Sequence, residues 1–407
     1  MNPPRIRPAH VRQALAALEA IVPATRPADA LMQELFRAHP QMGARDRAEI
    51  AGLVYGVLRN LRALQAGAAA DAATLLARHL VWDRHAPMPE GLGLADPGAP
   101  PPTLTPAERF NLSDSLYADL VARLGADDTA ALAESLRKEG SVDLRVNALR
   151  ARREQAVTAL SAANLAVTPT PWSPWGLRLT RRAPLQSLPA FREGWIEPQD
   201  EGSQLLALLL APRPGERVVD FCAGAGGKTL ALGAQMDNRG ELLALDTAAR
   251  RLEKLPPRAA RAGLRNVRTR ALRDEADPAL AAEAGGYDAV LVDAPCSGSG
   301  TLRRHPELLL RHFDTPALTA TQLSILRAAA RLLRPGGRLV YATCSLARAE
   351  NADVIARFLA DAPDFAEADA GAALQAQGVP WREPRLELLP HRHHTDGFFA
   401  VLLTRTR

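Results

Sequence analysis

Apolar residues recur every three or four positions through the first 80 residues, which is the pattern of amphipathic helices. Proline or glycine separates most of these segments, as expected where one helix ends and the next begins. The predicted helices are residues 11–21, 28–37, 45–64 and a further segment ending at Leu80. No alternating strand pattern interrupts them, so this part of the chain is predicted to be all helical.

The periodicity stops at residues 85–106, a proline- and glycine-rich stretch (HAPMPEGLGLADPGAPPPTLTP) that predicts a loop or linker. Two helices are expected beyond it, at residues 113–123 and 129–137. From Asp143 the pattern changes to short mixed elements. These are a strand-like LRVNAL, a helix at 152–163 and a turn-rich stretch at 172–182.

From about Ile196 apolar strands alternate with loops that carry glycine or aspartate and with helices. Strands separated by helices predict a parallel, doubly wound sheet, whose ligands bind beyond the carboxyl ends of the strands. The candidate strands are 217–221, 241–245, 267–270, 289–292, 338–342 and a closing pair at 386–389 and 398–404. We therefore look for the chemistry in the loops that follow these strands.

Length and composition fit this division. A chain of 407 residues that is 47% hydrophobic and 23% charged is long enough for two or three domains. Its longest nearly pure apolar run, 205–211, is too short to span a bilayer, and MNPPRIRPAH has no hydrophobic signal core. We expect a cytoplasmic protein. Three cysteines, none of them at CxxC spacing, predict neither a disulfide framework nor a zinc site.

The net charge of +5 is unevenly distributed. Residues 1–140 hold 15 basic and 16 acidic groups, whereas residues 141–407 hold 35 and 29. Residues 301–350 alone carry 8 basic and 3 acidic groups, which suits a phosphate backbone. Charge alone does not separate a nucleic-acid-binding protein from an ordinary basic surface.

The loop after the first strand reads DFCAGAGGKT from Asp220. Glycines let the backbone approach a ligand, and the helix that follows offers free N–H groups to an anion. The loop is not a phosphate-binding P-loop, because Cys222 stands where that motif needs its first glycine, and its glycines do not make GxGxxG. The next strand ends at Asp246, at the distance from the loop expected of a ribose-binding acid. This pattern fits NAD and S-adenosylmethionine (SAM) equally, and a helix-capping aspartate is the alternative.

Cys296 follows the fourth strand in DAPCSGSG, and Cys344 follows the fifth in ATCS. Neighbouring strands would bring both thiols to one pocket. Carbon 5 of cytosine becomes nucleophilic once a thiolate adds to carbon 6, so paired thiols beside a methyl donor suit this reaction. Asp293 is placed to hydrogen-bond the base, and the second thiol would serve product release. Cys222 is interpreted as structural.

These motifs, with the Asp220 loop and DGFFAV at 396–401, resemble those of the RsmB/Sun group of RNA cytosine-C5 methyltransferases, which use SAM. GARDRAEIAGLVYGVLRN at 43–60 looks like the NusB-like RNA-binding domain of that group, and 143–165 resembles its small connecting domain. The resemblance implies an all-α NusB-like domain (1–140), a small α+β connector (141–195) and a Rossmann-like SAM-dependent methyltransferase domain (196–407). The sheet of this last domain would be parallel, with an antiparallel closing hairpin.

The resemblance also assigns roles that spacing alone left open. It makes Cys344 the nucleophile, Cys296 the releasing cysteine and Asp293 the acid beside cofactor and base. Asp246 would bind the ribose, and Lys228 the methionine carboxylate. The cofactor loop then comprises Cys222, Ala223, Gly224, Ala225, Gly226, Gly227 and Lys228.

Two departures from the family pattern stand out. The usual CAAPGGK is CAGAGGK here, which removes a proline that stiffens the turn. The aspartate that the family places near the adenine amino group aligns with Leu272 or Asp274, and Asp274 is the candidate.

Outside the cofactor and cysteine loops, Arg303, Arg304 and His305 lie in the most basic stretch and are predicted to contact RNA, against the alternative of structural loop charges. The histidines at 391, 393 and 394 are interpreted as a polar hairpin loop rather than a metal site.

The leading hypothesis is a monomeric SAM-dependent cytosine-C5 methyltransferase, with 16S rRNA or a partly assembled small subunit as substrate and neither metal nor membrane involved. A tRNA substrate is one alternative. Another is an RNA-binding assembly factor with weak or lost methyltransferase activity. A small-molecule or protein methyltransferase would leave the paired cysteines unexplained.

Overall fold

The computed structural model describes residues 6–24, 26–66, 70–89, 91–101 and 103–407. It divides into two compact units, one made of Met1–Glu139 with Thr301–Phe313 and the other of Gly140–Gly300 with Asp314–Arg407. We refer to them as the helical unit and the sheet unit. Within the described ranges, no helix combines the length and the apolar character needed to cross a membrane.

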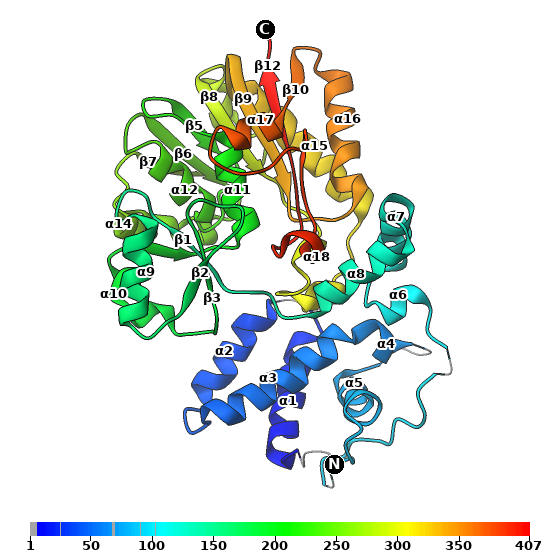
Figure 1. Ribbon diagram of the computed structural model, residues 1–407. Helices are drawn as coiled ribbons and strands as arrows, with labels where there is room; N and C mark the ends of the chain where they lie inside the picture. Colours follow the sequence, from blue (N-terminus) through cyan, green and yellow to red (C-terminus); the bar gives the residue numbers. More distant parts are fainter. Residues whose placement is uncertain (1–5, 25, 67–69, 90, 102) are drawn as a thin grey trace. The chain divides into compact units, whose positions relative to one another are not determined.

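The helical unit confirms the expected run of amphipathic helices (Figure 1). The apolar faces of the helices up to residue 83 share one core, to which Leu18, Leu53 and Leu75 contribute fully buried side chains. The helices are α1 (Pro8–Ile21), α2 (Ala28–Ala38), α3 (Ala44–Arg59), α4 (Leu61–Gln65), α5 (Ala72–Arg78), η1 (His79–Asp83), α6 (Pro106–Arg109), α7 (Asp114–Leu124) and α8 (Ala126–Arg137).

The single helix predicted at residues 45–64 is two helices in the structure, α3 and α4. Asn60 has φ −119° and ψ 16°, which is not helical, and its side-chain amide donates to the Gly56 carbonyl oxygen at 3.1 Å. A side chain that bonds the backbone of its own helix competes with the helical ladder, which explains the break.

A segment from far along the chain completes the helical unit. It contains η5 (Pro306–Leu310), whose Leu309 and Leu310 pack against the helical core. The buried carboxylate of Glu307 accepts a hydrogen bond from the backbone N–H of Ala28 at 3.3 Å. Residues 301–313 therefore fold with the helices although they follow the first cysteine loop.

The sheet unit begins with a small antiparallel sheet in the order β2-β3-β1-β4. Its elements are β1 (Asp143–Val146), α9 (Arg153–Ala162), β2 (Val167–Pro169), β3 (Gly176–Leu179), η2 (Leu185–Ser187), α10 (Pro189–Arg192) and β4 (Ile196–Pro198). The strand expected at LRVNAL ends early because the Asn147 side chain forms a turn, accepting from Leu149 N and donating to Gly194 O. The sequence analysis did not predict β2, β3 or β4, and β3 lies inside the stretch that was interpreted as turns.

The main sheet has the order β10-β12-β9-β8-β5-β6-β7, with β11 paired to β12. Strands β9, β8, β5, β6 and β7 are parallel, and β12 runs antiparallel to β9. This confirms the predicted α/β class and the antiparallel closing pair. The strands are β5 (Arg217–Asp220), β6 (Glu241–Asp246), β7 (Val267–Ala271), β8 (Tyr287–Asp293), β9 (Leu333–Thr343), β10 (Phe365–Ala368), β11 (Leu386–Leu388) and β12 (Phe398–Arg405).

Alternate side chains of these strands face two separate cores. Val218 packs with α11 and α12 on one face, while its neighbour Val219 packs with α15 and α16 on the other (Figure 1). A sheet buried on both faces explains the nearly continuous apolar strands. The helices of this part are α11 (Glu201–Leu210), α12 (Gly227–Gln235), α13 (Ala249–Leu252), α14 (Leu255–Ala262), η3 (Pro278–Glu283), η4 (Ser299–Thr301), α15 (Thr315–Leu332), η6 (Arg348–Glu350), α16 (Ala352–Asp361), α17 (Ala370–Gln375) and α18 (Pro390–His393).

The sequence analysis did not predict β10. It pairs with β12 at the end of the sheet, with Phe365 opposite Arg405. Only Phe365 among its four residues is buried, so the strand lacks the apolar run that marks the others.

Candidate active site

The two cysteine loops meet at the carboxyl ends of adjacent strands. Strands β8 and β9 pair in parallel, with Asp293 opposite Ala342, as predicted. The register brings the Cys296 and Cys344 sulfur atoms to 3.3 Å from each other, within hydrogen-bonding distance, and both thiols are free. Both side chains are half-buried.

The Cys296 thiol is held in its protonated form. The hydrogen bond to Cys344, together with burial, raises the pKa of Cys296 well above that of an ordinary thiol. Cys296 therefore keeps its proton and can donate it to the Cys344 sulfur. A cysteine is nucleophilic as its thiolate, and the assignment of Cys344 as the nucleophile stays a prediction.

A buried carboxylate that the sequence analysis did not identify joins the two loops. Glu350 is 2% exposed and accepts hydrogen bonds from Ser297 N at 2.8 Å, Ser297 Oγ at 2.6 Å and Ser345 Oγ at 2.6 Å. The fully buried Gln322 donates to Glu350 Oε2 at 3.0 Å and to the Pro295 carbonyl oxygen at 2.9 Å. Ser297 and Ser345, which follow the two cysteines in the chain, are thus hydrogen-bonded to the same carboxylate group.

Gly300 joins three of the sequence motifs. Its N–H donates to the Cys344 carbonyl oxygen at 2.9 Å, and its carbonyl oxygen accepts from Gly397 N at 2.8 Å. A Cβ at position 300 would lie 2.2 Å from the Gly397 carbonyl oxygen, which is far too close. DAPCSGSG, ATCS and DGFFAV therefore depend on one another through backbone contact.

Lys228 connects the glycine loop to the first cysteine loop. Its ammonium lies 2.6 Å from Asp293 Oδ2 and 5.8 Å from the centre of the Phe398 ring. Burial lowers the pKa of Lys228, but the charge of Asp293 and the hydrogen bond to it outweigh this effect, so the pKa is raised overall. Lys228 remains protonated and supplies a positive charge beside Asp293.

The glycine loop is a tight turn between β5 and α12. Gly226 N donates to the Ala223 carbonyl oxygen at 2.8 Å, and Gly224 and Gly226 have φ of 55° and 85°. Only glycine adopts such angles without strain. The carbonyl oxygen of Ala225, between them, accepts a hydrogen bond from the Arg258 guanidinium. Arg258 also donates to Glu197 Oε1 at 2.6 Å, so it braces the loop from outside.

Asp246 ends β6 and contacts the same loop. Its carboxylate accepts from Gly224 N at 2.7 Å and from Ala248 N at 2.7 Å. It therefore orders both the glycine loop and the start of the following helix. The ribose contact remains a prediction.

Below the loop, Asp220 is fully enclosed and Cys222 is partly buried. Burial raises the pKa of Asp220 to about 7, although Thr229 Oγ1 donates to Asp220 Oδ2 at 2.6 Å. Asp220 Oδ1 is buried and has no hydrogen-bond partner within the described part of the chain. Burial also raises the pKa of Cys222, which packs against the core that α15 and α16 form with the sheet; its structural role stays a prediction.

The remaining predicted residues are Asp274 and the group Arg303, Arg304 and His305. Asp274 is exposed and accepts from Ala276 N at 2.9 Å, whereas Leu272 is buried and donates its N–H to the Asp246 carbonyl oxygen at 2.9 Å. The adenine contact of Asp274 therefore stays a prediction. Arg303, Arg304 and His305 lie in the helical unit, where Arg303 is buried. Their RNA contact is likewise untested.

The histidines at 391 and 393 lie in α18, between β11 and β12. Burial lowers the pKa of His393, whose Nδ1 accepts from Leu389 N at 2.9 Å and whose ring packs edge-on against Trp172. Among the residues described, no three histidine, cysteine, aspartate or glutamate side chains are grouped as a metal site.

The donors around the glycine loop fit SAM. The first turn of α12 offers backbone N–H groups and Lys228 a positive charge, both suited to the methionine carboxylate. The Asp246 carboxylate suits the two ribose hydroxyls. Cys296 follows β8, which pairs with β5, and Cys344 follows β9, the next strand in the sheet.

Comparison with known proteins agrees with this arrangement. Residues 207–404 match the 16S rRNA methyltransferase RsmB/F family, and residues 114–186 match the ferredoxin-like domain of RsmF/B-like methyltransferases. The probable ribosomal RNA small subunit methyltransferase B of Synechocystis sp. is 36% identical over 304 residues, 73% of this chain and 68% of that protein. Ribosomal RNA small subunit methyltransferase B of Salmonella heidelberg is 38% identical over 64% of this chain and 59% of its own length.

The fold comparison extends over nearly all of the chain. The crystal structure of PH0851 superposes with a TM-score of 0.84 and 26% identity, covering 98% of this chain and 99% of that one. Together the sequence and structure matches confirm the resemblance inferred from the motifs. The chain belongs to the RsmB/F family of 16S rRNA methyltransferases, whose methyl donor is SAM.

Proposed function

We propose that the protein methylates carbon 5 of a cytosine in small-subunit ribosomal RNA through a covalent bond between Cys344 and carbon 6 of the base. The observation that carries this proposal is the pair of sulfur atoms 3.3 Å apart at the ends of β8 and β9, beside the Lys228–Asp293 ion pair. A methyltransferase that acts on a sufficiently nucleophilic atom needs no thiol at all. Two thiols in contact next to a methyl-donor site are suited to a base that must be activated.

Cys344 acts first in this mechanism. Its thiolate adds to carbon 6, and the ring electrons move so that carbon 5 becomes the nucleophile. Negative charge develops toward the N3 edge of the ring. The Asp293 carboxylate can accept a hydrogen bond from the N4 amino group beside this edge, and Lys228, 2.6 Å from the same carboxylate, supplies a positive charge next to the ring.

Bound SAM supplies the electrophilic methyl group at carbon 5. A base then removes the proton from carbon 5, the electrons of the C–H bond restore the ring double bond, and the carbon–sulfur bond breaks toward Cys344. Cys296 can donate its thiol proton to the departing sulfur, because the two sulfur atoms are within hydrogen-bonding distance. This separates the roles of the two cysteines in time.

The experiment is methylation of small-subunit rRNA transcripts by the purified protein with SAM, followed by bisulfite mapping of 5-methylcytosine. We expect one modified cytosine with the wild-type protein and none with Cys344→Ser, while both proteins bind SAM equally. Methylation retained by Cys344→Ser would refute the covalent mechanism. Modification of tRNA but not rRNA would assign a different substrate to the same chemistry. RNA binding without measurable SAM affinity would identify an assembly factor instead.

A further inference from the structure

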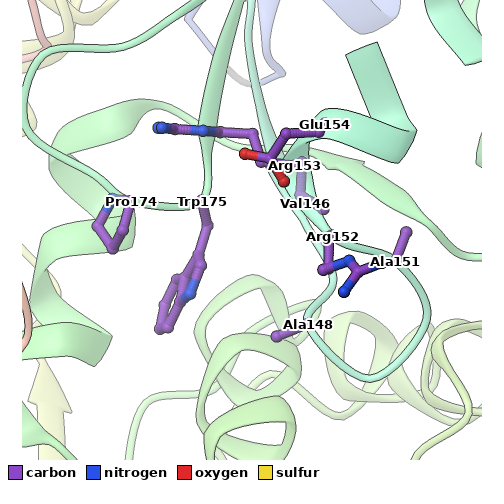
Figure 2. Close-up of a pocket in the computed structure, with 8 residues that line it drawn as sticks. All are labelled: Val146, Ala148, Ala151, Arg152, Arg153, Glu154, Pro174 and Trp175. Carbon is purple, nitrogen blue, oxygen red and sulfur yellow. The ribbon is translucent and has the colours of Figure 1, made fainter. Parts of the chain in front are cut away.

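A cavity of about 280 Å³ opens in the connecting part of the sheet unit, away from both cysteine loops. Its walls come from the end of β1 at Val146, the first turn of α9 and the residues before β3. Figure 2 shows the Trp175 indole on one side of the opening and Arg152 on the other, with Arg153 extending above Pro174. The cavity is at the small end of the range for ligand sites, which suits a single planar group.

Two arginines at this cavity have no anionic partner. Arg152 is exposed and Arg153 half-buried, and neither side chain makes an ion pair or hydrogen bond with the residues that the structure describes. Arg178, in the same small sheet, is instead bound by Asp143 through two hydrogen bonds. The stretch from Arg145 to Arg153 holds four arginines and no acidic residue. Among the residues that line the cavity, Glu154 is the acidic one. Unpaired guanidinium groups are well suited to phosphate.

The aromatic wall is fixed in position and has an unused donor. The backbone of Trp175 is tied to β1 by the hydrogen bond from Val146 N to the Trp175 carbonyl oxygen at 2.9 Å. Its indole is half-buried, and the indole N–H has no partner among the described residues. By contrast, Trp172 and Trp381 donate theirs to backbone carbonyls at 3.2 and 3.0 Å. A held, partly exposed ring is a stacking platform for a nucleobase.

The loop that carries the two arginines is anchored to the main sheet. Asn147 Nδ2 donates to the Ala262 carbonyl oxygen at the end of α14, at 2.8 Å. Leu149 packs against the core that includes Ala223 of the glycine loop. Anything bound in the cavity is therefore held in a fixed relation to the cofactor loop.

We propose that this cavity binds one nucleotide of a single-stranded segment of the RNA substrate, outside the target cytosine. Its base stacks on Trp175, and the phosphates on either side contact Arg152 and Arg153. The inference rests on the proposed function in taking RNA as the substrate. It adds a contact that positions the RNA without touching the reacting atoms.

Binding of a fluorescent small-subunit rRNA fragment, measured by anisotropy over a range of KCl concentrations, tests the arginines. The variant Arg152→Gln/Arg153→Gln is expected to bind the RNA about tenfold more weakly. The slope of the logarithm of affinity against the logarithm of salt concentration should become shallower by about the amount of one phosphate contact. The control Arg357→Gln/Arg382→Gln removes the same charge from exposed positions on α16 and after α17. It should change neither quantity.

The tryptophan is tested with Trp175→Ala, expected to weaken binding about tenfold, and Trp175→Phe, expected to restore most of it because the ring is kept. Unchanged SAM affinity in each variant shows that the fold is retained. In methylation assays the pocket variants should raise the KM for RNA and leave kcat nearly unchanged. Ultraviolet cross-linking of RNA that carries 5-iodouridine should place an adduct on the peptide containing Trp175.

The proposal would be overturned if Arg152→Gln/Arg153→Gln and Trp175→Ala both bound RNA with the affinity and salt dependence of the wild-type protein. Cross-links found only on other tryptophans would also overturn it. Variants that bind and methylate naked RNA normally but fail on assembled particles would assign the cavity to a protein partner and also overturn it. Because affinity is measured without methyl transfer, failure of the cytosine-C5 chemistry would leave this test intact. A wild-type protein that does not bind RNA would refute both.

Discussion

Replacing Glu350 by glutamine tests whether one buried carboxylate holds the two cysteine loops in position. Four donors converge on it: Ser297 N, Ser297 Oγ, Ser345 Oγ and Gln322 Nε2, at 2.6 to 3.0 Å. Glutamine keeps the volume but loses the charge. The two N–H donors cannot reverse direction, so the amide oxygen must face them, and both serine hydroxyls must turn to accept from the amide nitrogen.

The expected magnitude follows from this count. A hydrogen bond to a charged group contributes about 1 kcal/mol more than a neutral one, so the four bonds lose about 4 kcal/mol at most. Part of this loss appears as movement of the loops. Because a displacement of about 1 Å at a reacting group costs about 100-fold in rate, we expect methyl transfer to slow by at least about tenfold.

The assay is the single-turnover rate of methyl transfer from radiolabelled SAM to RNA, with SAM affinity measured separately. Glu350→Gln should lower the rate and leave the SAM affinity within about twofold, because Glu350 contacts no part of the glycine loop in any described hydrogen bond. Glu216→Gln is the matched control. Glu216 directly precedes β5 and accepts charged hydrogen bonds from Arg338. It therefore lies at the amino ends of the parallel strands, whereas the cysteines lie at their carboxyl ends. A wild-type rate in Glu350→Gln would refute the positioning role.

Two further predictions concern the glycine loop and the group beneath it. Arg258→Ala should weaken SAM binding about tenfold, measured by calorimetry, because the charged hydrogen bond to the Ala225 carbonyl oxygen is lost. Adding Ala225→Pro should recover part of the affinity, because proline restricts the turn. Unchanged affinity in Arg258→Ala would contradict the bracing role. Asp220 has a folded pKa of about 7 against 3.8 ordinarily, so the folded state holds the extra proton and stability falls as pH rises from about 4 to 7. Asp220→Asn should remove that decline, which urea unfolding at pH 5 and pH 8 will measure, and an unaltered pH dependence would show that Asp220 ionises normally.

The sequence predicted those parts of the fold in which apolar runs are long and loops contain the chemistry. Strands β5, β6, β8, β9 and β12 each contain a run of buried residues, whereas β7 was predicted although none of its five residues is buried. Adjacency of β8 and β9 follows from the doubly wound pattern, and with it the contact between Cys296 and Cys344. The short strands β2, β3, β4 and β10 could not be predicted, because pairing with neighbouring strands and not their own composition makes them strands.

The supporting contacts of the site were beyond sequence reasoning for a different reason. Glu350 lies 53 residues from Ser297 and 28 from Gln322, and nothing in the chain near any of them signals the others. Likewise, Arg258 reaches Ala225 across 33 residues. One local signal was available for Glu350, a lone acid six residues after Cys344, but its burial becomes evident only in three dimensions.

The basic stretch at 301–350 shows the limit of reasoning along the chain. Its charge was counted along the chain as one excess, yet residues 301–313 fold with the helical unit and Asp314 onward with the sheet unit. Contacts of Glu307 and Leu310 with helices that lie far earlier in the sequence decide this division.

The covalent bond to Cys344 is tested most directly by incubating the Cys296→Ala variant with SAM and cytosine-containing rRNA, then separating the products under denaturing conditions. If Cys296 serves release, the variant should accumulate a protein–RNA complex that survives denaturation, and mass spectrometry should find the nucleotide on the peptide containing Cys344. The double variant Cys296→Ala/Cys344→Ser should form none. Methylation by Cys296→Ala with no covalent complex, or an adduct on a residue other than Cys344, would contradict the mechanism.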